Sequence, residues 1–158
     1  MSKINVTETK GEPAGTLVWT SASEEETFRA GVEVGGQLAG GEILLLSGGL
    51  GAGKTAFVKG VAASLGVDPE EVTSPSFTLV NPHWAGGLRL YHIDLYRLDA
   101  GPGAAYAVDL EELMDDESAV IAIEWAERLG RFPLPENVWR IRIEGDGDAP
   151  RRISLNRP

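Results

Sequence analysis

The sequence has 158 residues, of which 42% are hydrophobic and 24% charged, as expected for one globular domain. It contains no cysteine, which excludes disulfides, zinc–thiolate sites and cysteine nucleophiles. The net charge is −10, with 14 Lys and Arg against 24 Asp and Glu, and this balance argues against direct wrapping of DNA or RNA. No segment resembles a signal peptide or a membrane span, so we expect a cytoplasmic protein.

The N-terminal part of the chain predicts a leader, a strand and a helix. Residues 1–15 are polar and are expected to form a flexible N-terminal leader, followed by a single domain over residues 16–158. The run 16–19 predicts a short strand. Ser21 or Ser23 suits the N-cap of a helix, because three glutamates follow in its first turn. The expected apolar stripe of this helix consists of Phe28, Val32 and Leu38.

Two apolar runs further along predict strands that are buried on both faces. The first, 42–47, leads through glycines into a predicted helix from Lys54 to about Leu65. The second run, 119–123, ends at Glu124, and the glycines and proline of 101–103 are expected to break the chain between them. The other predicted elements are a hairpin of 76–81 with 88–96, a short helix in 109–116, a helical turn in 126–131, and strands at 139–143 and 152–155.

The strongest motif lies between the first buried strand and its following helix. It fits the P-loop pattern G-x-x-x-x-G-K-[ST] in full. Its glycines let backbone N–H groups converge on phosphate oxygens, and the helix adds its own unpaired N–H groups. The lysine is expected to reach the β- and γ-phosphates and the threonine to bind Mg²⁺. The predicted nucleotide-binding residues are Gly48, Gly49, Leu50, Gly51, Ala52, Gly53, Lys54 and Thr55.

Together with the element order, this motif predicts the fold class. We expect an α/β P-loop NTPase domain, a three-layer sandwich over residues 16–158. Its mixed central sheet should have a parallel core, an antiparallel hairpin and antiparallel edge strands, because strands alternate with helices early in the chain and dominate late.

Glu124 is the second candidate, since carboxylates at the ends of neighbouring strands face the ligand crevice of such sheets. It would complete the Mg²⁺ shell with Thr55; the alternative is a surface glutamate that merely ends a core strand. His92 and Asp94 alternate onto one strand face and are candidates for positioning water, or else form an ordinary polar pair on a solvated face.

The segment 74–78 offers hydroxyl groups around a rigidifying proline, between the P-loop helix and the next strand. Such a segment can act as a switch that senses the γ-phosphate, although an ordinary capped turn is equally compatible with the spacing. Its hydroxyl-bearing residues are Ser74, Ser76 and Thr78.

Four blocks together resemble the TsaE (YjeE) family of small bacterial P-loop ATPases. These blocks are 50–55, 74–80, 92–98 and 123–125. The resemblance implies ATP and Mg²⁺ as ligands, a weak ATPase activity that depends on partners, and homologues of TsaB and TsaD as those partners. It implies a role in forming the threonylcarbamoyl group on adenosine next to the anticodon of tRNAs that read codons beginning with A, with tRNA contacted only through the complex.

The resemblance also implies roles for individual residues. Thr55 and Glu124 would be the Mg²⁺ ligands, and Ser74, Ser76 and Thr78 the switch-like segment. The nucleotide would further contact the start of the first helix, from Glu24 to Thr27. The implied catalytic residues are Lys54, His92, Asp94 and Glu124.

Two positions depart from the family pattern. Gly49 stands where the family usually has Asp, and Ser76 where it usually has Thr.

Two other functions stay open. A small-molecule kinase would need an acceptor pocket and an arginine-rich lid, yet only Arg89 and Arg97 fall near the central strands. A nucleotide-sensing interaction module would bind ATP without needing hydrolysis.

Overall fold

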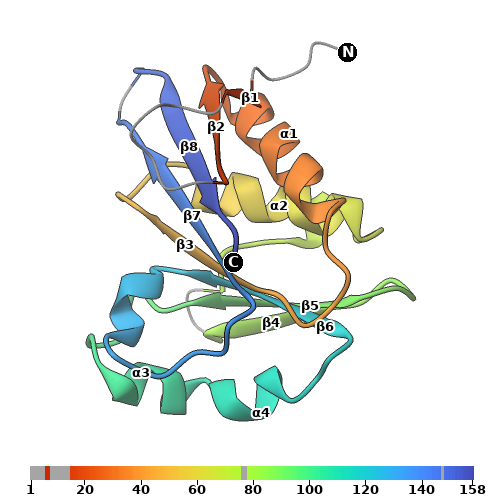
Figure 1. Cartoon of the computed structure of the whole chain (residues 1–158), viewed down its shortest axis with the longest axis vertical. Helices are drawn as coiled ribbons and strands as arrows, with labels where there is room; N and C mark the ends of the chain where they lie inside the picture. The colour runs from red at the N-terminus through yellow and green to blue at the C-terminus, as the bar shows by residue number, and fades with distance from the viewer. Residues whose placement is uncertain (1–5, 8–14, 76–77, 147) are drawn as a thin grey trace.

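The computed structural model describes residues 6–7, 15–75, 78–146 and 148–158. Within these residues, eight strands form one sheet in the order β1-β2-β8-β7-β3-β6-β5-β4 (Figure 1). Strands β7, β3, β6 and β5 are parallel, and the other neighbours pair antiparallel. The strands are β1 Val6–Thr7, β2 Thr16–Ser21, β3 Ile43–Gly48, β4 Val80–His83, β5 Arg89–Asp94, β6 Ala119–Glu124, β7 Val138–Glu144 and β8 Arg151–Asn156.

The helices form two layers on opposite faces of this sheet (Figure 1). Helices α1 (Glu24–Gly35) and α2 (Lys54–Ser64) cover one face, and the short helices α3 (Pro102–Ala107) and α4 (Leu110–Met114) pack against the other. Two 3₁₀ turns complete the described structure, η1 at Pro69–Glu71 and η2 at Ala126–Leu129. The predicted α/β three-layer architecture with a mixed sheet is therefore confirmed.

The buried strands explain why their sequences are continuously apolar. In β3, Leu44 and Leu46 pack in the core under α1 and α2, whereas Ile43 and Leu45 pack in the core beside α3 and α4. Because successive side chains of a strand point to opposite faces, a strand covered on both sides needs apolar residues at every position. Both faces of β6 are buried in the same way.

Helices α1 and α2 approach each other closely through glycines. A Cβ atom at Gly31 would lie 2.1 Å from the carbonyl oxygen of Phe57, and one at Gly60 would lie 2.0 Å from that of Phe28. The prediction that Val32 belongs to the buried stripe is wrong, because its exposure is 36%. The buried face of α1 instead consists of Thr27, Ala30, Gly31, Val34 and Gly35.

Other differences from the sequence predictions have local causes. The break expected at 101–103 is the start of α3, with Pro102 in the first turn, where a missing N–H costs nothing. Ser23, rather than Ser21, is the N-cap of α1. Strand β4 covers 80–83 instead of 76–81, and Ser76 lies outside the described residues.

Most of the predicted leader also lies outside the described residues. Val6 and Thr7 are described, and they pair with Trp19 and Val18 of β2. No helix in the described ranges is long and apolar enough to cross a membrane.

Candidate nucleotide-binding site

The carboxyl ends of three parallel strands bring the predicted residues to one edge of the sheet. Leu46 of β3 pairs with Glu124 of β6, which in turn pairs with Asp94 of β5. Strand β3 continues directly into the P-loop. A cavity of about 440 Å³ opens at this edge, and its lining includes Glu24, Lys54, Thr55, Ser74, Asp94, Arg97 and Glu124.

The P-loop has the backbone of an anion-binding loop. Gly48 and Gly53 have φ angles of 152° and 107°, which residues with a Cβ atom rarely adopt. A Cβ atom at Gly48 would also lie 2.4 Å from the carbonyl oxygen of Ile143 in β7. The N-cap of α2, Gly53, supplies no side-chain hydrogen bond to the helix. The first N–H groups of this 11-residue helix therefore suit an anionic ligand.

Lys54 is buried at the base of the cavity, with 5% of its surface exposed. Its Nζ donates hydrogen bonds to the carbonyl oxygens of Gly48 at 2.7 Å and Gly49 at 2.8 Å, and lies 4.1 Å from the ring centroid of Trp125. Burial lowers the pKa of the Lys54 ammonium, and the carboxylates of Glu124, Glu127 and Asp94 oppose this shift. Lys54 is thus a desolvated cation with contacts that a phosphate oxygen could replace.

Glu124 is the centre of a buried polar cluster. Thr55 Oγ1 donates to its two carboxylate oxygens, at 3.0 and 3.1 Å, and His92 Nε2 is hydrogen-bonded to Oε2. Glu124 is 3% exposed and His92 fully buried. The two predicted metal ligands, Thr55 and Glu124, therefore lie in direct contact.

His92 and Asp94 lie two residues apart on β5 but have different partners. His92 contacts Glu124, its Nδ1 has no hydrogen-bond partner among the described residues, and it is absent from the cavity lining. Asp94 lines the cavity, and its carboxylate accepts hydrogen bonds from Ser74 Oγ at 2.7 Å and from the backbone N–H of Tyr96 at 2.9 Å. Of these two residues, Asp94 therefore faces the cavity, whereas His92 contacts the cavity-lining Glu124.

The predicted switch residues do not share one environment. Ser74 lines the cavity and donates to Asp94, whereas Thr78 is absent from the cavity lining and its Oγ1 donates to Asn81 Oδ1 at 2.8 Å. Ser76 lies outside the described residues, so its predicted role has no structural counterpart here.

The start of α1, which the resemblance implies as a nucleotide contact, borders the P-loop. Glu24 lines the cavity, and the methyl group of Thr27 lies 3.4 Å from the position of a Cβ atom built on Gly53. The hydroxyl groups of Thr27 and Ser21 are also hydrogen-bonded to each other, at 2.8 Å. A neighbouring hollow of about 410 Å³ lies between this helix start, the P-loop and Arg151.

Arg151 is a site residue to which no sequence pattern points. Its Nε donates to the carbonyl oxygen of Ala52 at 3.3 Å, and its Nη2 to that of Gly51 at 3.4 Å. The contact ties β8 to the P-loop across about a hundred residues of sequence. Only the pairing of β8 with β7, beside β3, brings this arginine to the loop.

The site combines a strand, a glycine-rich loop and a helix without a side-chain cap, and its buried lysine faces carboxylates at the strand ends. This is the architecture of an α/β P-loop protein. The model of one protein family, "Threonylcarbamoyl adenosine biosynthesis protein TsaE", matches residues 21–153. The chain belongs to this family.

Similar proteins agree with this assignment. A protein of Treponema pallidum described as "tRNA threonylcarbamoyladenosine biosynthesis protein TsaE" is 41% identical over 135 residues, which cover 85% of this chain and 96% of that protein. A Bacillus subtilis protein with the same description is 35% identical over 88% of this chain and 84% of its own length. The crystal structure of Bacillus subtilis YdiB superposes with a TM-score of 0.68 at 32% identity, covering 90% of this chain and 85% of that one.

The sequence resemblance is thereby confirmed. The chain is a member of a family for the biosynthesis of threonylcarbamoyladenosine in tRNA, and its P-loop indicates a nucleotide-binding protein.

Proposed function

We propose that this chain is the ATP-binding and ATP-hydrolysing subunit in the formation of threonylcarbamoyladenosine in tRNA. It would act in the cytoplasm with homologues of TsaB and TsaD and contact tRNA only through that complex. The observation that most directly supports the proposal is a single cavity lined by Lys54, Thr55 and Glu124, in which Thr55 is hydrogen-bonded to Glu124. Family membership supports the pathway, and a step in a biosynthetic pathway implies partner proteins.

The residues around the cavity fit a nucleoside triphosphate with Mg²⁺. The backbone of the P-loop and the Lys54 ammonium would bind the phosphates. Thr55 and Glu124 would hold Mg²⁺, which prefers oxygen ligands and would neutralise phosphate charge. This fit rests on two oxygen-bearing side chains that already contact each other beside a cation.

The remaining polar residues would support hydrolysis in different ways. Asp94 would orient the attacking water, because its carboxylate lines the cavity. His92 would position Glu124, and Ser74 would couple the segment before β4 to Asp94. We expect weak turnover in the isolated chain, increased by the partner proteins.

The Lys54→Ala variant tests nucleotide binding. Loss of a buried cation that faces a polyphosphate should cost about 2–5 kcal/mol, or at least about 30-fold in the dissociation constant for ATP. Titration with a fluorescent ATP analogue in the presence of Mg²⁺ measures this, with Lys59→Ala on the same helix as the control. Equal ATP affinity in the wild type and in Lys54→Ala would refute the proposal.

The Asp94→Asn variant separates hydrolysis from sensing. It should retain ATP binding and lose about 10²–10⁴-fold in turnover. Reconstitution with TsaB, TsaD and tRNA then shows whether repeated modification stops. Continued modification without hydrolysis would favour the nucleotide-sensing module instead.

A further inference from the structure

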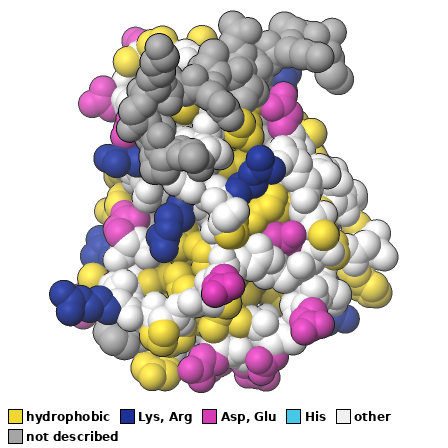
Figure 2. Space-filling view, in the orientation of Figure 1, with side chains coloured by type: hydrophobic (Ala, Val, Ile, Leu, Met, Phe, Trp, Pro, Cys, Tyr) yellow, Lys and Arg dark blue, Asp and Glu magenta, His cyan; other side chains and the backbone are white. Residues whose placement is uncertain are grey.

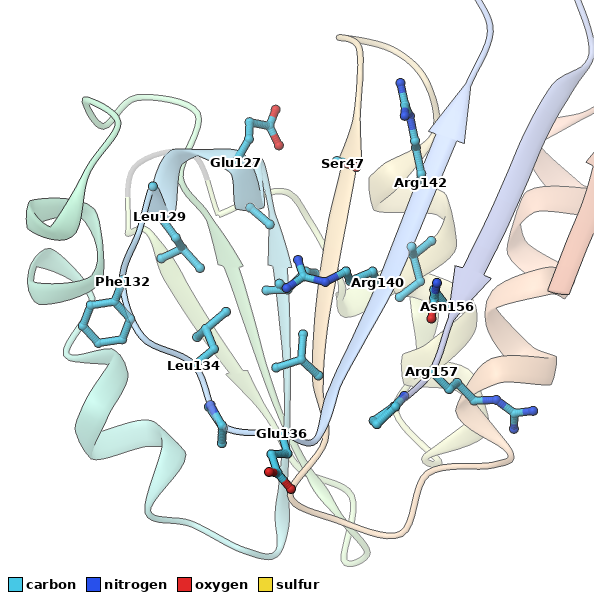
Figure 3. Close-up of a pocket in the computed structure, with 17 residues that line it drawn as sticks. Ser47, Glu127, Leu129, Phe132, Leu134, Glu136, Arg140, Arg142, Asn156 and Arg157 are labelled. Atoms are coloured by element: carbon cyan, nitrogen blue, oxygen red, sulfur yellow. The ribbon is translucent and has the colours of Figure 1, made fainter. Parts of the chain in front are cut away.

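A second and larger cavity, of about 690 Å³, lies on the sheet face opposite α1 and α2 (Figure 3). Strands β3 and β7 form its floor, and η2 with the segment 130–136 forms one wall. Helices α3 and α4 pack near β5 and β6, so they leave this part of the sheet uncovered (Figure 1). Figure 2 shows the same face, where hydrophobic side chains gather around a hollow beside Lys and Arg side chains.

The floor of this cavity is apolar, and a cation extends over it. Leu134 and Val138 are half-buried and supply apolar surface, and Leu45, which is 6% exposed, lies at the base. Arg140 pairs in register with Leu45 of β3, and Figure 3 shows its guanidinium group reaching across the cavity. Alternation along β7 explains this orientation, since Trp139 and Ile141 are buried under the helices on the other face.

The arginines of the cavity differ in their partners. Arg142 forms an ion pair with Glu144 at 2.8 Å, and Arg157 donates to Gln37 at 2.6 Å. The guanidinium group of Arg140 has neither a hydrogen bond nor an ion pair with any residue in the described ranges. A guanidinium group above apolar side chains, in a chain of net charge −10, is a local site for a carboxylate.

These properties favour a peptide over a nucleic acid. An RNA backbone presents successive phosphates and requires several cations, whereas Glu127 and Glu136 line the same cavity and Arg140 can balance only one negative charge, which suits a segment with a single carboxylate there. An extended peptide can place an apolar side chain on the floor and a carboxylate on Arg140. The volume suits a few side chains of such a segment.

The cavity and the candidate nucleotide site are also lined by residues that are close together in the sequence. Ser47 lines it and directly precedes the P-loop residue Gly48, while Ala126 and Glu127 line it shortly after Glu124. An occupant would therefore contact both segments that carry the site's P-loop and carboxylate.

We propose that this cavity is a docking site for an acidic segment of a partner protein, with an apolar side chain over Leu45, Leu134 and Val138 and a carboxylate on Arg140. The proposal is independent of ATP hydrolysis.

Selection of peptides from a random twelve-residue display library on the full chain provides the probe. The selected peptides should combine Asp or Glu with large apolar residues. Fluorescence anisotropy should show affinity reduced at least about tenfold by Arg140→Glu, and less by Arg140→Gln. Leu134→Asp should also weaken binding. Arg29→Glu, on α1 at the opposite face, is the charge-matched control and should change affinity by less than about twofold.

Several results would overturn the proposal. These are no selected peptide, selected peptides without acidic residues, or binding that Arg140→Glu leaves unchanged while thermal unfolding shows a folded variant. Binding of a single-stranded RNA oligonucleotide that is lost in Arg140→Glu would assign the cavity to phosphates. Self-association of the wild type that Arg140→Glu abolishes, measured by sedimentation, would assign it to a second copy of the chain.

Discussion

Strands β3, β7 and β8 present one face to α1 and α2 and the other to the larger cavity. On the helix-covered face, Leu46, Ile141 and Leu155 are almost completely buried. On the cavity face, Ser47, Arg140 and Asn156 line a hollow that none of the described α-helices covers. The same strands therefore contribute packing on one side and binding surface on the other, because adjacent residues of a strand point in opposite directions.

The residues at the carboxyl edge of the sheet combine a property of each face, because they are buried like the helix-covered face and polar like the cavity face. Glu124 and His92 are as buried as core leucines, yet they are polar and depend on each other for hydrogen bonds. Substitutions should therefore have the largest effect on stability on the helix-covered face, a moderate effect at the carboxyl edge, and almost none in the solvent-facing part of the P-loop.

The Gly31→Ala variant tests the helix-covered face and should have the largest effect. The added methyl group would lie 2.1 Å from the Phe57 carbonyl oxygen, so the α1 and α2 backbones must separate. We expect a loss of about 3 kcal/mol and a melting temperature lower by about 6–12 °C. Gly36→Ala is the control, because a Cβ atom there would have no neighbour closer than 3.6 Å. A similar melting temperature for both variants would contradict the close-packing argument.

Glu124→Ala and Glu124→Gln test the carboxyl edge. The alanine leaves Thr55 Oγ1 and His92 Nε2 without their acceptor and should cost about 1–3 kcal/mol in urea unfolding. The glutamine keeps hydrogen-bonding atoms in place and should lose less stability. If Mg²⁺ and ATP bind as proposed and stabilise the wild type, both variants should lose that stabilisation. If the glutamine variant unfolds as early as the alanine variant, the negative charge, and not the hydrogen bonds, holds the cluster.

Gly49→Asp should have the smallest effect on stability. A Cβ atom at Gly49 would have no neighbour within 4 Å, and the φ angle of this glycine is not positive. Aspartate, the residue that the sequence resemblance leads us to expect at this position, therefore fits without strain. We expect the free energy of unfolding to change by less than about 0.5 kcal/mol. A loss above 1 kcal/mol by urea unfolding would show that Gly49 has a packing role.

Several elements were predictable because their signals are local. The apolar runs of β3 and β6 and the N-cap of α1 are properties of a few consecutive residues. Helix α3 was missed because its glycines and proline are typical of a chain break, although proline is well tolerated in a first turn. The burial of Val32 was predicted wrongly because helical periodicity cannot show that α1 packs through its glycines.

The sequence alone determined the P-loop, because its properties come from eight consecutive residues and from the backbone freedom of glycine. The partners of its side chains depend on the tertiary structure. Thr55 is hydrogen-bonded to Glu124, 69 residues away in the sequence, and Arg151 to the P-loop, about a hundred residues away. Both contacts depend on the strand order β8-β7-β3-β6-β5. The strand predicted at 139–143 contains Arg140, but only the tertiary structure shows that its guanidinium group extends over the cavity without a side-chain partner in the described part of the chain. Strand order results from packing between distant segments, which local periodicity does not encode.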